Sequence, residues 1–360
     1  MLITVDMKRF LLILAGLLVL QSAFAQRQRR PVTPADTLNS VRVHPDGSVT
    51  FSIFAPEAHS VALGSDLSGK GTFTKDADGI WSATIPDLQA IAYRYHFVVD
   101  GVQVYDPRSP QINDRRPVLQ LTKGQDLFWA HKDVPHGAIS VLRYPSSTIG
   151  TERQLHVWTP AGYIASGKEL PVLYLVHGMG DSDADWSQIG CAGDILDNLL
   201  AEGKIEPMVV VMPNGAVSVN QFPDELTNDI RPFIEKNFKV KKGPANTALA
   251  GLSMGGMETK ATITAHPTDY CYVGIFSGGT LSVEESRQMP GFRENNKLIF
   301  INYGSYEVAN IAEGRPDPAK LTQELKESGL NAHYLVTPDS AHEWKTWRLA
   351  LYTFSQMLFK

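Results

Sequence analysis

The residues best suited to chemistry lie in one short stretch, which reads G-L-S-M-G over residues 251–255. An apolar run over 247–250 precedes it, and a helical pattern of apolar residues follows it as far as Pro267. A strand, a G-x-S-x-G turn and a helix in this order are typical of a nucleophile elbow, because the sharp turn lifts the serine hydroxyl clear of the sheet. Side chains at either glycine would collide with neighbouring backbone. We therefore predict that Ser253 is a nucleophile rather than an incidental serine in a glycine-rich turn.

A serine hydroxyl is a poor nucleophile until a base takes its proton. Three histidines follow Ser253 in the chain, namely His266, His333 and His342. His266 comes at the end of the helix that follows the elbow, and His333 opens a predicted strand. His342 lies in the loop between the last predicted strand and the last predicted helix, where enzymes with such an elbow place their base. We therefore predict that His342 is the general base.

The third member of such a site is a carboxylate, which fixes the tautomer of the imidazole and stabilises the imidazolium. Glu307 comes just after the predicted strand 298–303, where this acid is expected. Asp339, Asp317 and Asp269 remain alternatives, and Glu307 could instead cap or pair locally. On position we predict Glu307 as the acid.

An oxyanion that forms on the substrate needs two backbone amides as hydrogen-bond donors. One is expected from Met254, the residue after the nucleophile. The other is expected from the loop after the apolar strand 172–176, which reads H-G-M-G. Glycines there let the backbone approach a substrate, and either Gly178 or Met179 supplies the second amide.

The metal-binding residue types do not form a recognisable site. Asp181, Asp183 and Asp185 follow the same loop but lack the remaining ligands of an EF-hand, so we interpret them as a solvated loop. The two cysteines, Cys191 and Cys271, are too few and too far apart for zinc, and they are either bonded to each other or two buried thiols. We predict no metal and no cofactor.

The elements that must position these residues occupy residues 138–360. Strands and helices alternate there, which implies a doubly wound, mostly parallel sheet. With the elbow, this sheet predicts an α/β-hydrolase domain. The predicted strands cover 172–176, 208–212, 247–250, 272–277, 298–303 and 333–336, and the predicted helices cover 195–202, 224–238, 318–328 and 344–359.

The part of the chain before this domain has a different pattern. Residues 38–122 alternate with a period of two and turn often, which predicts an immunoglobulin-like all-β sandwich of about seven short strands. Residues 123–137 are a predicted linker. Residues 1–25 have a basic start, an apolar run and an A-F-A cleavage site, which predicts a signal peptide, followed by a flexible lead-in over 26–37.

Charge and leader together limit the partners. The net charge of −5 gives no electrostatic support for nucleic acid as a partner. A cleaved signal peptide leaves no membrane anchor, and it predicts a periplasmic or secreted protein.

Several motifs resemble carbohydrate esterase family 1, which includes feruloyl and acetylxylan esterases. They lie at residues 144–153, 157–163, 175–178, 250–256 and 342–348. The resemblance implies Ser253 as nucleophile and His342 as base, and it places the acid in a G-x-x-D motif. This sequence has G-S-Y-E there, so glutamate replaces aspartate. Motifs at 55–58, 78–81 and 93–95 resemble the family-48 carbohydrate-binding module, which implies an immunoglobulin-like fold.

Export and a sugar-binding type of module next to this type of esterase predict the substrate. We expect acyl esters of plant cell-wall polysaccharide such as xylan, with feruloyl esters first and acetyl esters second. Trp186, Phe276 and Trp344 are predicted to contact the acyl group, although Phe276 and Trp344 could equally belong to the core. The N-terminal domain is a candidate to bind carbohydrate, or it only docks against the catalytic domain and shapes its cleft. The alternatives are a siderophore esterase and a carbohydrate-binding protein without activity.

Overall fold

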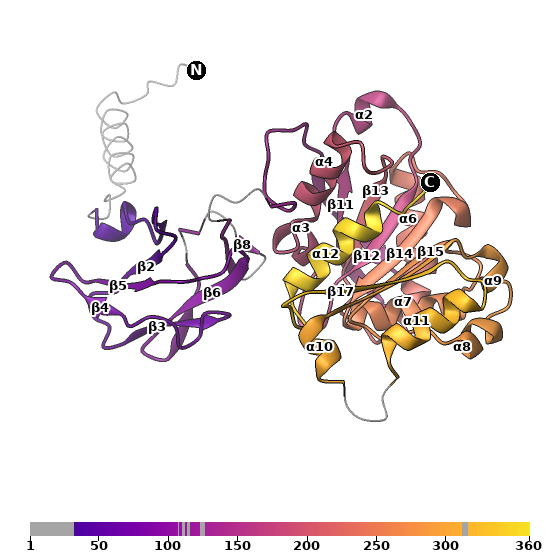
Figure 1. The fold of residues 1–360 in the computed structure, drawn as a ribbon. Coiled ribbons are helices and arrows are strands. Elements are labelled where there is room, and N and C mark those ends of the chain that lie inside the picture. Colours follow the sequence, from indigo (N-terminus) through magenta and orange to yellow (C-terminus); the bar gives the residue numbers. More distant parts are fainter. Residues whose placement is uncertain (1–31, 107, 110–111, 114–115, 123–126, 312–315) are drawn as a thin grey trace, which may run out of the picture.

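The computed structural model describes residues 32–106, 108–109, 112–113, 116–122, 127–311 and 316–360. The predicted signal peptide and residues 26–31 of the predicted lead-in lie outside these residues. Figure 1 shows an N-terminal unit of strands beside a larger unit in which helices cover a sheet. Within the described residues, no helix is both long enough and apolar enough to cross a membrane.

The N-terminal unit is a sandwich of two antiparallel sheets, as predicted. One has the order β1-β2-β5-β4, and the other has β3-β6-β9-β8 with β7 on β6. Alternate residues point between the sheets, so that Phe51 and Tyr95 meet edge to face at 5.2 Å. The strands are β1 (Val41–Val43), β2 (Val49–Phe54), β3 (Val61–Ser65), β4 (Thr74–Lys75), β5 (Ile80–Ile85), β6 (Ala92–Val99), β7 (Val102–Val104), β8 (Ile112–Asn113) and β9 (Arg116–Gln120).

The second unit is built on an eight-stranded sheet with the order β10-β11-β13-β12-β14-β15-β16-β17. The β10–β11 and β11–β13 pairs are antiparallel, and the five pairs from β13 through β12 to β17 are parallel. The strands are β10 (Ala138–Ser146), β11 (Thr151–Thr159), β12 (Val172–Val176), β13 (Val209–Pro213), β14 (Thr247–Leu252), β15 (Tyr272–Phe276), β16 (Leu298–Gly304) and β17 (Ala332–Thr337).

Helices cover both faces of this sheet, which makes it the α/β-hydrolase fold that the sequence predicts. The predicted helix over 224–238 is divided, because a π-helical turn over Leu226–Ile230 separates α5 from α6. The helices are α2 (Tyr163–Ser166), α3 (Asp185–Gln188), α4 (Ala192–Ala201), α5 (Phe222–Glu225), α6 (Arg231–Asn237), α7 (Met254–Ala265), α8 (Val283–Gln288), α9 (Phe292–Asn295), α10 (Ser305–Ala309), α11 (Pro318–Glu327) and α12 (Trp344–Ser355).

The two faces of the sheet have separate cores, because side chains alternate along each strand. Leu173 and Leu175 of β12 pack with α4 and α12, whereas Val172, Tyr174 and Val176 pack on the other face with α6 and its neighbours. Cys191 and Cys271 are free and buried, so the alternative of a disulfide between them is not realised.

The part of the linker that is described, residues 127–137, packs against the hydrolase domain. The Asn198 side chain of α4 donates hydrogen bonds to the carbonyls of Phe128 and Ala130 at 3.1 and 2.9 Å. The guanidinium of Arg348 lies 4.3 Å from the ring centroid of Trp129. These contacts fix where the connection from the sandwich joins α4 and α12.

Candidate active site

Ser253 stands at the turn between β14 and α7, as the elbow motif predicts. Its backbone has φ 52° and ψ −116°, a conformation that residues with a side chain rarely adopt. The Ser253 amide donates to the carbonyl of Phe276 at 2.8 Å, which ties this conformation to the neighbouring strand β15. Such local strain is typical of functional sites, where the surrounding structure over-determines the backbone.

The glycines of the motif are required by close approaches of backbone. A Cβ added to Gly251 would lie 2.2 Å from the carbonyl oxygen of Gly255, and one added to Gly255 would lie 2.5 Å from the carbonyl oxygen of His177. Real Cβ atoms do not approach backbone this closely. The turn therefore needs glycine at both positions, whatever the backbone angles.

His342 lies beside Ser253, where the sequence predicted the base. Its Nε2 is 2.8 Å from Ser253 Oγ, and its Nδ1 is 2.7 Å from Glu307 Oε1. An ionised carboxylate can only accept hydrogen bonds, so the ring proton belongs on Nδ1. Nε2 is then the acceptor for the serine hydroxyl, which is the arrangement that a general base requires.

Glu307 is held by more than the imidazole. It lies in α10, directly after β16, and its Oε2 accepts hydrogen bonds from the Gly304 amide at 2.7 Å and the Ser277 hydroxyl at 2.8 Å. Burial alone would raise the pKa of Glu307. The hydrogen bonds from His342, Gly304 and Ser277 outweigh burial and hold that pKa below its ordinary value. The lowered pKa favours the charged form of the Glu307 carboxylate beside His342.

The alternative acids have other places in the fold. Asp317 caps the N-terminus of α11, and Asp269 forms an ion pair with Arg231. Asp339 is exposed, whereas the contact to His342 Nδ1 is made by Glu307. The geometry thus brings Ser253, His342 and Glu307 together in one relay.

Trp347, which the sequence analysis covers only within the 342–348 motif, and Ser277, which it does not name, complete the surroundings of the imidazole. The Trp347 ring meets the His342 ring edge to face at 5.1 Å, and its Nε1 donates to Ser277 Oγ at 3.2 Å. Ser277 in turn donates to Glu307. The W-K-T-W-R run after His342 was a visible signal for Trp347. Ser277 was concealed because it follows an apolar strand by one residue.

The loop after β12 lies against the nucleophile. A Cβ added to Gly178 would be 3.1 Å from Ser253 Cβ. The Gly178 carbonyl accepts hydrogen bonds from His177 Nδ1 at 2.8 Å and from the Asp181 amide at 3.2 Å. Met254 is the first residue of α7, so its amide has no partner within the helix. Gly178 and Met254 therefore lie near Ser253, and Met179 is the next residue of the loop. That two of these amides hold an oxyanion stays a prediction.

A cleft of about 380 Å³ opens at Ser253 and His342. One wall comes from the hydrolase domain and includes Met179 and Trp344. The other wall comes from the sandwich and includes Tyr93 and Arg94. The two domains therefore share the space in which a substrate would lie, and Trp344 is in place to contact it.

The structure contradicts the prediction for two of the three aromatic residues. Trp186 is 1% exposed and Phe276 is fully buried, and neither lines the cleft. Trp186 donates from Nε1 to the Val176 carbonyl at 3.0 Å and meets Trp344 edge to face at 5.2 Å. Both side chains belong to the core behind Trp344, so they support the cleft wall without reaching its surface.

The interpretation of the acidic loop as solvated was also wrong. The Asp181 and Asp185 side chains are 8% and 6% exposed, and both contact Nη2 of Arg94 in the sandwich, at 2.6 and 2.8 Å. Asp183 is buried too, and accepts from His156 Nδ1 at 2.7 Å. Burial of carboxylates requires such partners. The signal was missed because the partners lie far away in the sequence.

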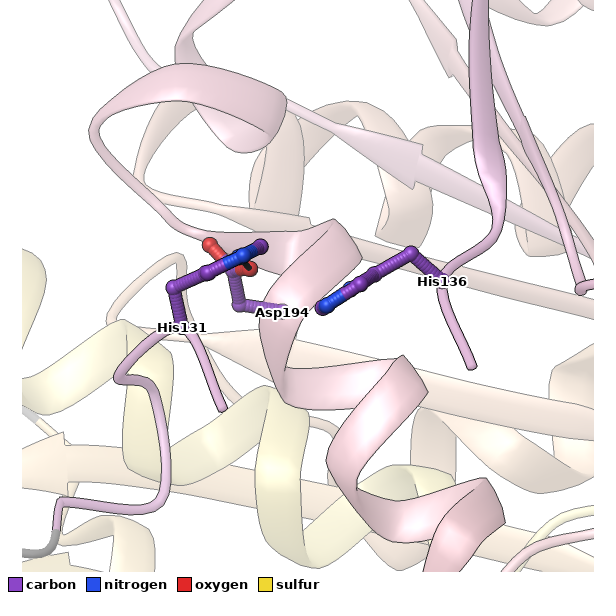
Figure 2. Close-up of side chains that lie close together, drawn as sticks. All are labelled: His131, His136 and Asp194. Atoms are coloured by element: carbon purple, nitrogen blue, oxygen red, sulfur yellow. Dashed lines mark hydrogen bonds and ion pairs between the residues drawn. The ribbon is translucent and has the colours of Figure 1, made fainter. Parts of the chain in front are cut away.

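A second cluster of histidine and aspartate side chains, of the types that bind metals, lies where the linker meets α4 (Figure 2). Nδ1 of His131 is 2.8 Å from Asp194, and Nδ1 of His136 is 3.1 Å from Asp197. The two rings stack at 4.2 Å with 7° between their planes. A metal would need the in-plane lone pairs of both rings to converge, which parallel stacked rings do not provide. We interpret the cluster as a set of contacts that hold the linker against α4.

Comparison with known proteins identifies the family and several relatives of this chain. The family described as Putative esterase matches residues 146–357. An endo-1,4-beta-xylanase/feruloyl esterase of Xylanibacter ruminicola is 35% identical over 340 residues, which are 88% of this chain and 46% of that protein. Endo-1,4-beta-xylanase Y of Acetivibrio thermocellus is 24% identical over 236 residues, 57% of this chain and 22% of that protein. The chain thus spans less than half the length of these relatives.

Solved structures share the fold. A ferulic acid esterase from Anaeromyces mucronatus in complex with ferulic acid has a TM-score of 0.55 at 24% identity, and covers 65% of this chain and 96% of that one. The enterobactin esterase of Shigella flexneri has a TM-score of 0.55 at 15% identity, and covers 86% of this chain and 92% of that one. The second match extends over the N-terminal part as well.

Proposed function

The chain belongs to the putative esterase family, and from this membership and its site we propose that it is a serine carboxylic ester hydrolase. The observation on which the proposal depends is the relay from Ser253 Oγ through His342 to Glu307, with both contacts within 2.8 Å. Hydroxyl, imidazole and buried carboxylate in this order are the groups that acyl transfer requires.

The reaction has two steps. His342 Nε2 takes the proton of Ser253 as Oγ attacks the ester carbonyl, and the Met254 amide with an amide of the 178–179 loop stabilises the oxyanion. The alcohol leaves with the proton from His342, and Ser253 carries the acyl group. Water then attacks this ester with His342 again as the base, which releases the acid and restores the serine. Glu307 stabilises the imidazolium in both steps.

The substrate class that we propose is feruloyl esters on xylan, with acetyl esters second. The similarity to the Xylanibacter protein, whose name includes both xylanase and feruloyl esterase, supports it. Trp344 in the cleft wall offers an aromatic surface for a hydroxycinnamoyl group. Export through the sequence at 1–25 and carbohydrate binding by the sandwich belong to the same proposal, because such substrates lie outside the cell.

The test uses the purified chain with methyl ferulate, feruloylated arabinoxylan, p-nitrophenyl acetate and acetylated xylan. Ser253→Ala is compared with Ser166→Ala, an exposed serine of α2 near the start of β12. We expect Ser253→Ala to lower kcat by about 10⁴-fold or more, and Ser166→Ala to leave it unchanged. Activity that survives Ser253→Ala would remove the proposed nucleophile.

A siderophore esterase is the second candidate, because the enterobactin esterase fold matches 86% of the chain. A catechol trilactone is therefore included among the substrates. Preference for the trilactone over methyl ferulate by kcat/KM would select this candidate and reject the feruloyl assignment, while leaving the serine mechanism intact.

A further inference from the structure

Arg94 connects the sandwich to the hydrolase domain through a well-enclosed contact. It lies in β6, its side chain is 14% exposed, and its Nη2 contacts Asp181 at 2.6 Å and Asp185 at 2.8 Å. Its guanidinium also lies 5.9 Å from the ring centroid of Trp344. One cation shared between two buried carboxylates is a far stronger attachment than an exposed ion pair.

The two carboxylates belong to the loop that lies against Ser253. The Asp181 amide donates to the Gly178 carbonyl at 3.2 Å and closes the turn 178–181. Asp185 Oδ2 accepts from the amide and hydroxyl of Ser182 at 2.6 and 3.0 Å, which holds the next part of the loop. Arg94 therefore contacts the 178–185 loop at two places, Asp181 and Asp185.

This turn sets the direction of one backbone amide. The Gly178 carbonyl is fixed by two donors, His177 Nδ1 and the Asp181 amide. In a planar trans peptide the N–H points opposite to the carbonyl, so fixing the Gly178 carbonyl also fixes the Met179 N–H. The Gly178 amide belongs to the preceding peptide, whose His177 carbonyl lies against Gly255 of α7 and not in this turn. Of the two candidates for the second oxyanion donor, Met179 is thus the one that the turn orients.

We propose that Arg94 is a positioning residue of the active site, by which the sandwich holds the 178–185 loop and orients the Met179 amide toward the oxyanion. The inference rests on the proposed serine esterase mechanism. It gives the N-terminal domain a part in the chemistry that does not depend on binding carbohydrate.

The effect of removing Arg94 follows from the charges left behind. Without the guanidinium, Asp181 and Asp185 are two buried carboxylates without their common cation, and their repulsion and hydration open the turn. Loss of one oxyanion donor lowers kcat by about 10²–10³-fold. A displaced donor is not wholly lost, so we expect Arg94→Met to lower kcat by roughly 10–100-fold, with KM changed less than about threefold.

The experiment compares Arg94→Met, Arg94→Lys and Asp181→Asn in the full chain. The control is Arg143→Met, which removes an ion pair to Glu152 whose side chains are 71% and 63% exposed. Each variant is assayed with p-nitrophenyl acetate and methyl ferulate, and its inhibition by an aryl boronic acid, which forms a tetrahedral adduct on serine, is compared with inhibition by ferulate. Thermal unfolding shows that each variant is folded at the assay temperature.

The expected result is an equal fall in kcat on both esters for Arg94→Met, with weaker boronic acid binding and unchanged ferulate binding. Arg94→Lys should recover part of kcat, because one ammonium retains the charge but not the shared contact. If Arg94→Met does not fold, Arg94→Lys and Asp181→Asn supply the same comparison.

Two results would overturn the inference. If Arg94→Met has a lower Tm but a kcat on p-nitrophenyl acetate within twofold of the parent protein, Arg94 only stabilises the contact between the two domains. A loss confined to methyl ferulate makes it a contact of the acyl group. Failure of the proposed function looks different, since the parent protein would then hydrolyse none of the esters, or Ser253→Ala would keep its activity.

Discussion

The loop that carries His342 and the loop that carries Met179 are held in place by different parts of the molecule. Around His342, Ser340 Oγ lies 2.6 Å from the Thr346 hydroxyl, and the Tyr306 amide donates to the Ser340 carbonyl at 2.9 Å. All of these groups belong to the hydrolase domain. The 178–185 loop also depends on Arg94, which belongs to the sandwich.

The difference separates the two tasks of an ester hydrolase. Proton transfer uses groups that the hydrolase domain positions with its own strands and helices. Charge stabilisation uses an amide whose orientation depends on a contact with another domain. Substitutions of His342 or Glu307 should therefore damage proton transfer without changing how the sandwich supports the 178–185 loop.

The largest effect is expected at the acid. Glu307→Gln removes the negative charge that fixes the Nδ1–H tautomer of His342 and stabilises its cation, so kcat should fall by about 10²–10⁴-fold. Steady-state kinetics on p-nitrophenyl acetate measure this. Because the 178–185 loop is untouched, the affinity for an aryl boronic acid should fall less than in Arg94→Met. A larger loss of boronic acid affinity in Glu307→Gln than in Arg94→Met would contradict the separation of proton transfer from oxyanion stabilisation.

A smaller effect, on stability, is expected beneath the elbow. Glu258 of α7 is fully buried, and both carboxylate oxygens lack a hydrogen-bond partner among the described residues. Burial, with the charge of Glu225, raises the pKa of Glu258 from 4.5 to about 9. Between these values the unfolded chain releases a proton that the folded protein keeps, so stability falls as pH rises.

Glu258→Gln removes this dependence, because an amide does not ionise. We expect the two proteins to have similar Tm near about pH 4.5, and the variant to be more stable near pH 8.5 by on the order of a few kcal/mol. Thermal unfolding across this range tests it. A variant that is less stable than its parent at the higher pH would contradict the assignment of a neutral Glu258. Its kcat near neutral pH should be unchanged.

The smallest effect is expected at the linker. The hydrogen bond to Asp197 raises the pKa of His136 above its ordinary value, against the opposing effect of burial. A raised histidine pKa contributes stability below the unfolded value of 6.5, and the contribution disappears as pH rises through the folded value. His136→Gln should therefore lower Tm slightly near about pH 5.5 and not at pH 8.5, with kcat unchanged. A loss of kcat would show that the linker affects the active site.

The sequence predicts that Ser253, His342 and Glu307 lie together, because each of them is tied to a local pattern. Ser253 lies in a motif between a strand and a helix, and Glu307 and His342 each follow one of the last two strands. Chain order and strand ends are features that a single sequence displays directly. Glu307 could be proposed as the acid despite the unusual residue type, because its position after β16 was sufficient.

The sequence predictions were wrong or incomplete where a residue's role depends on which side of a strand it faces or on a partner far away in the sequence. Phe276 and Ser277 are neighbours, yet Phe276 points into the core and Ser277 contacts Glu307. A period of two fixes that they differ but does not say which one faces the site. Arg94 and Asp181 are 87 residues apart, and only the docking of the two domains brings them together.

Glu307 both caps α10 and contacts His342, and these two roles restrict which residues can replace it. One carboxylate oxygen bonds the Gly304 amide at the start of α10, and the other bonds the imidazole. Aspartate is one methylene shorter, so from the same backbone position its carboxylate reaches less far towards the imidazole. We therefore expect an exchange between the two acids to be accompanied by a shift of the short helix α10. Relatives with aspartate here should differ in the course of the chain between β16 and α10.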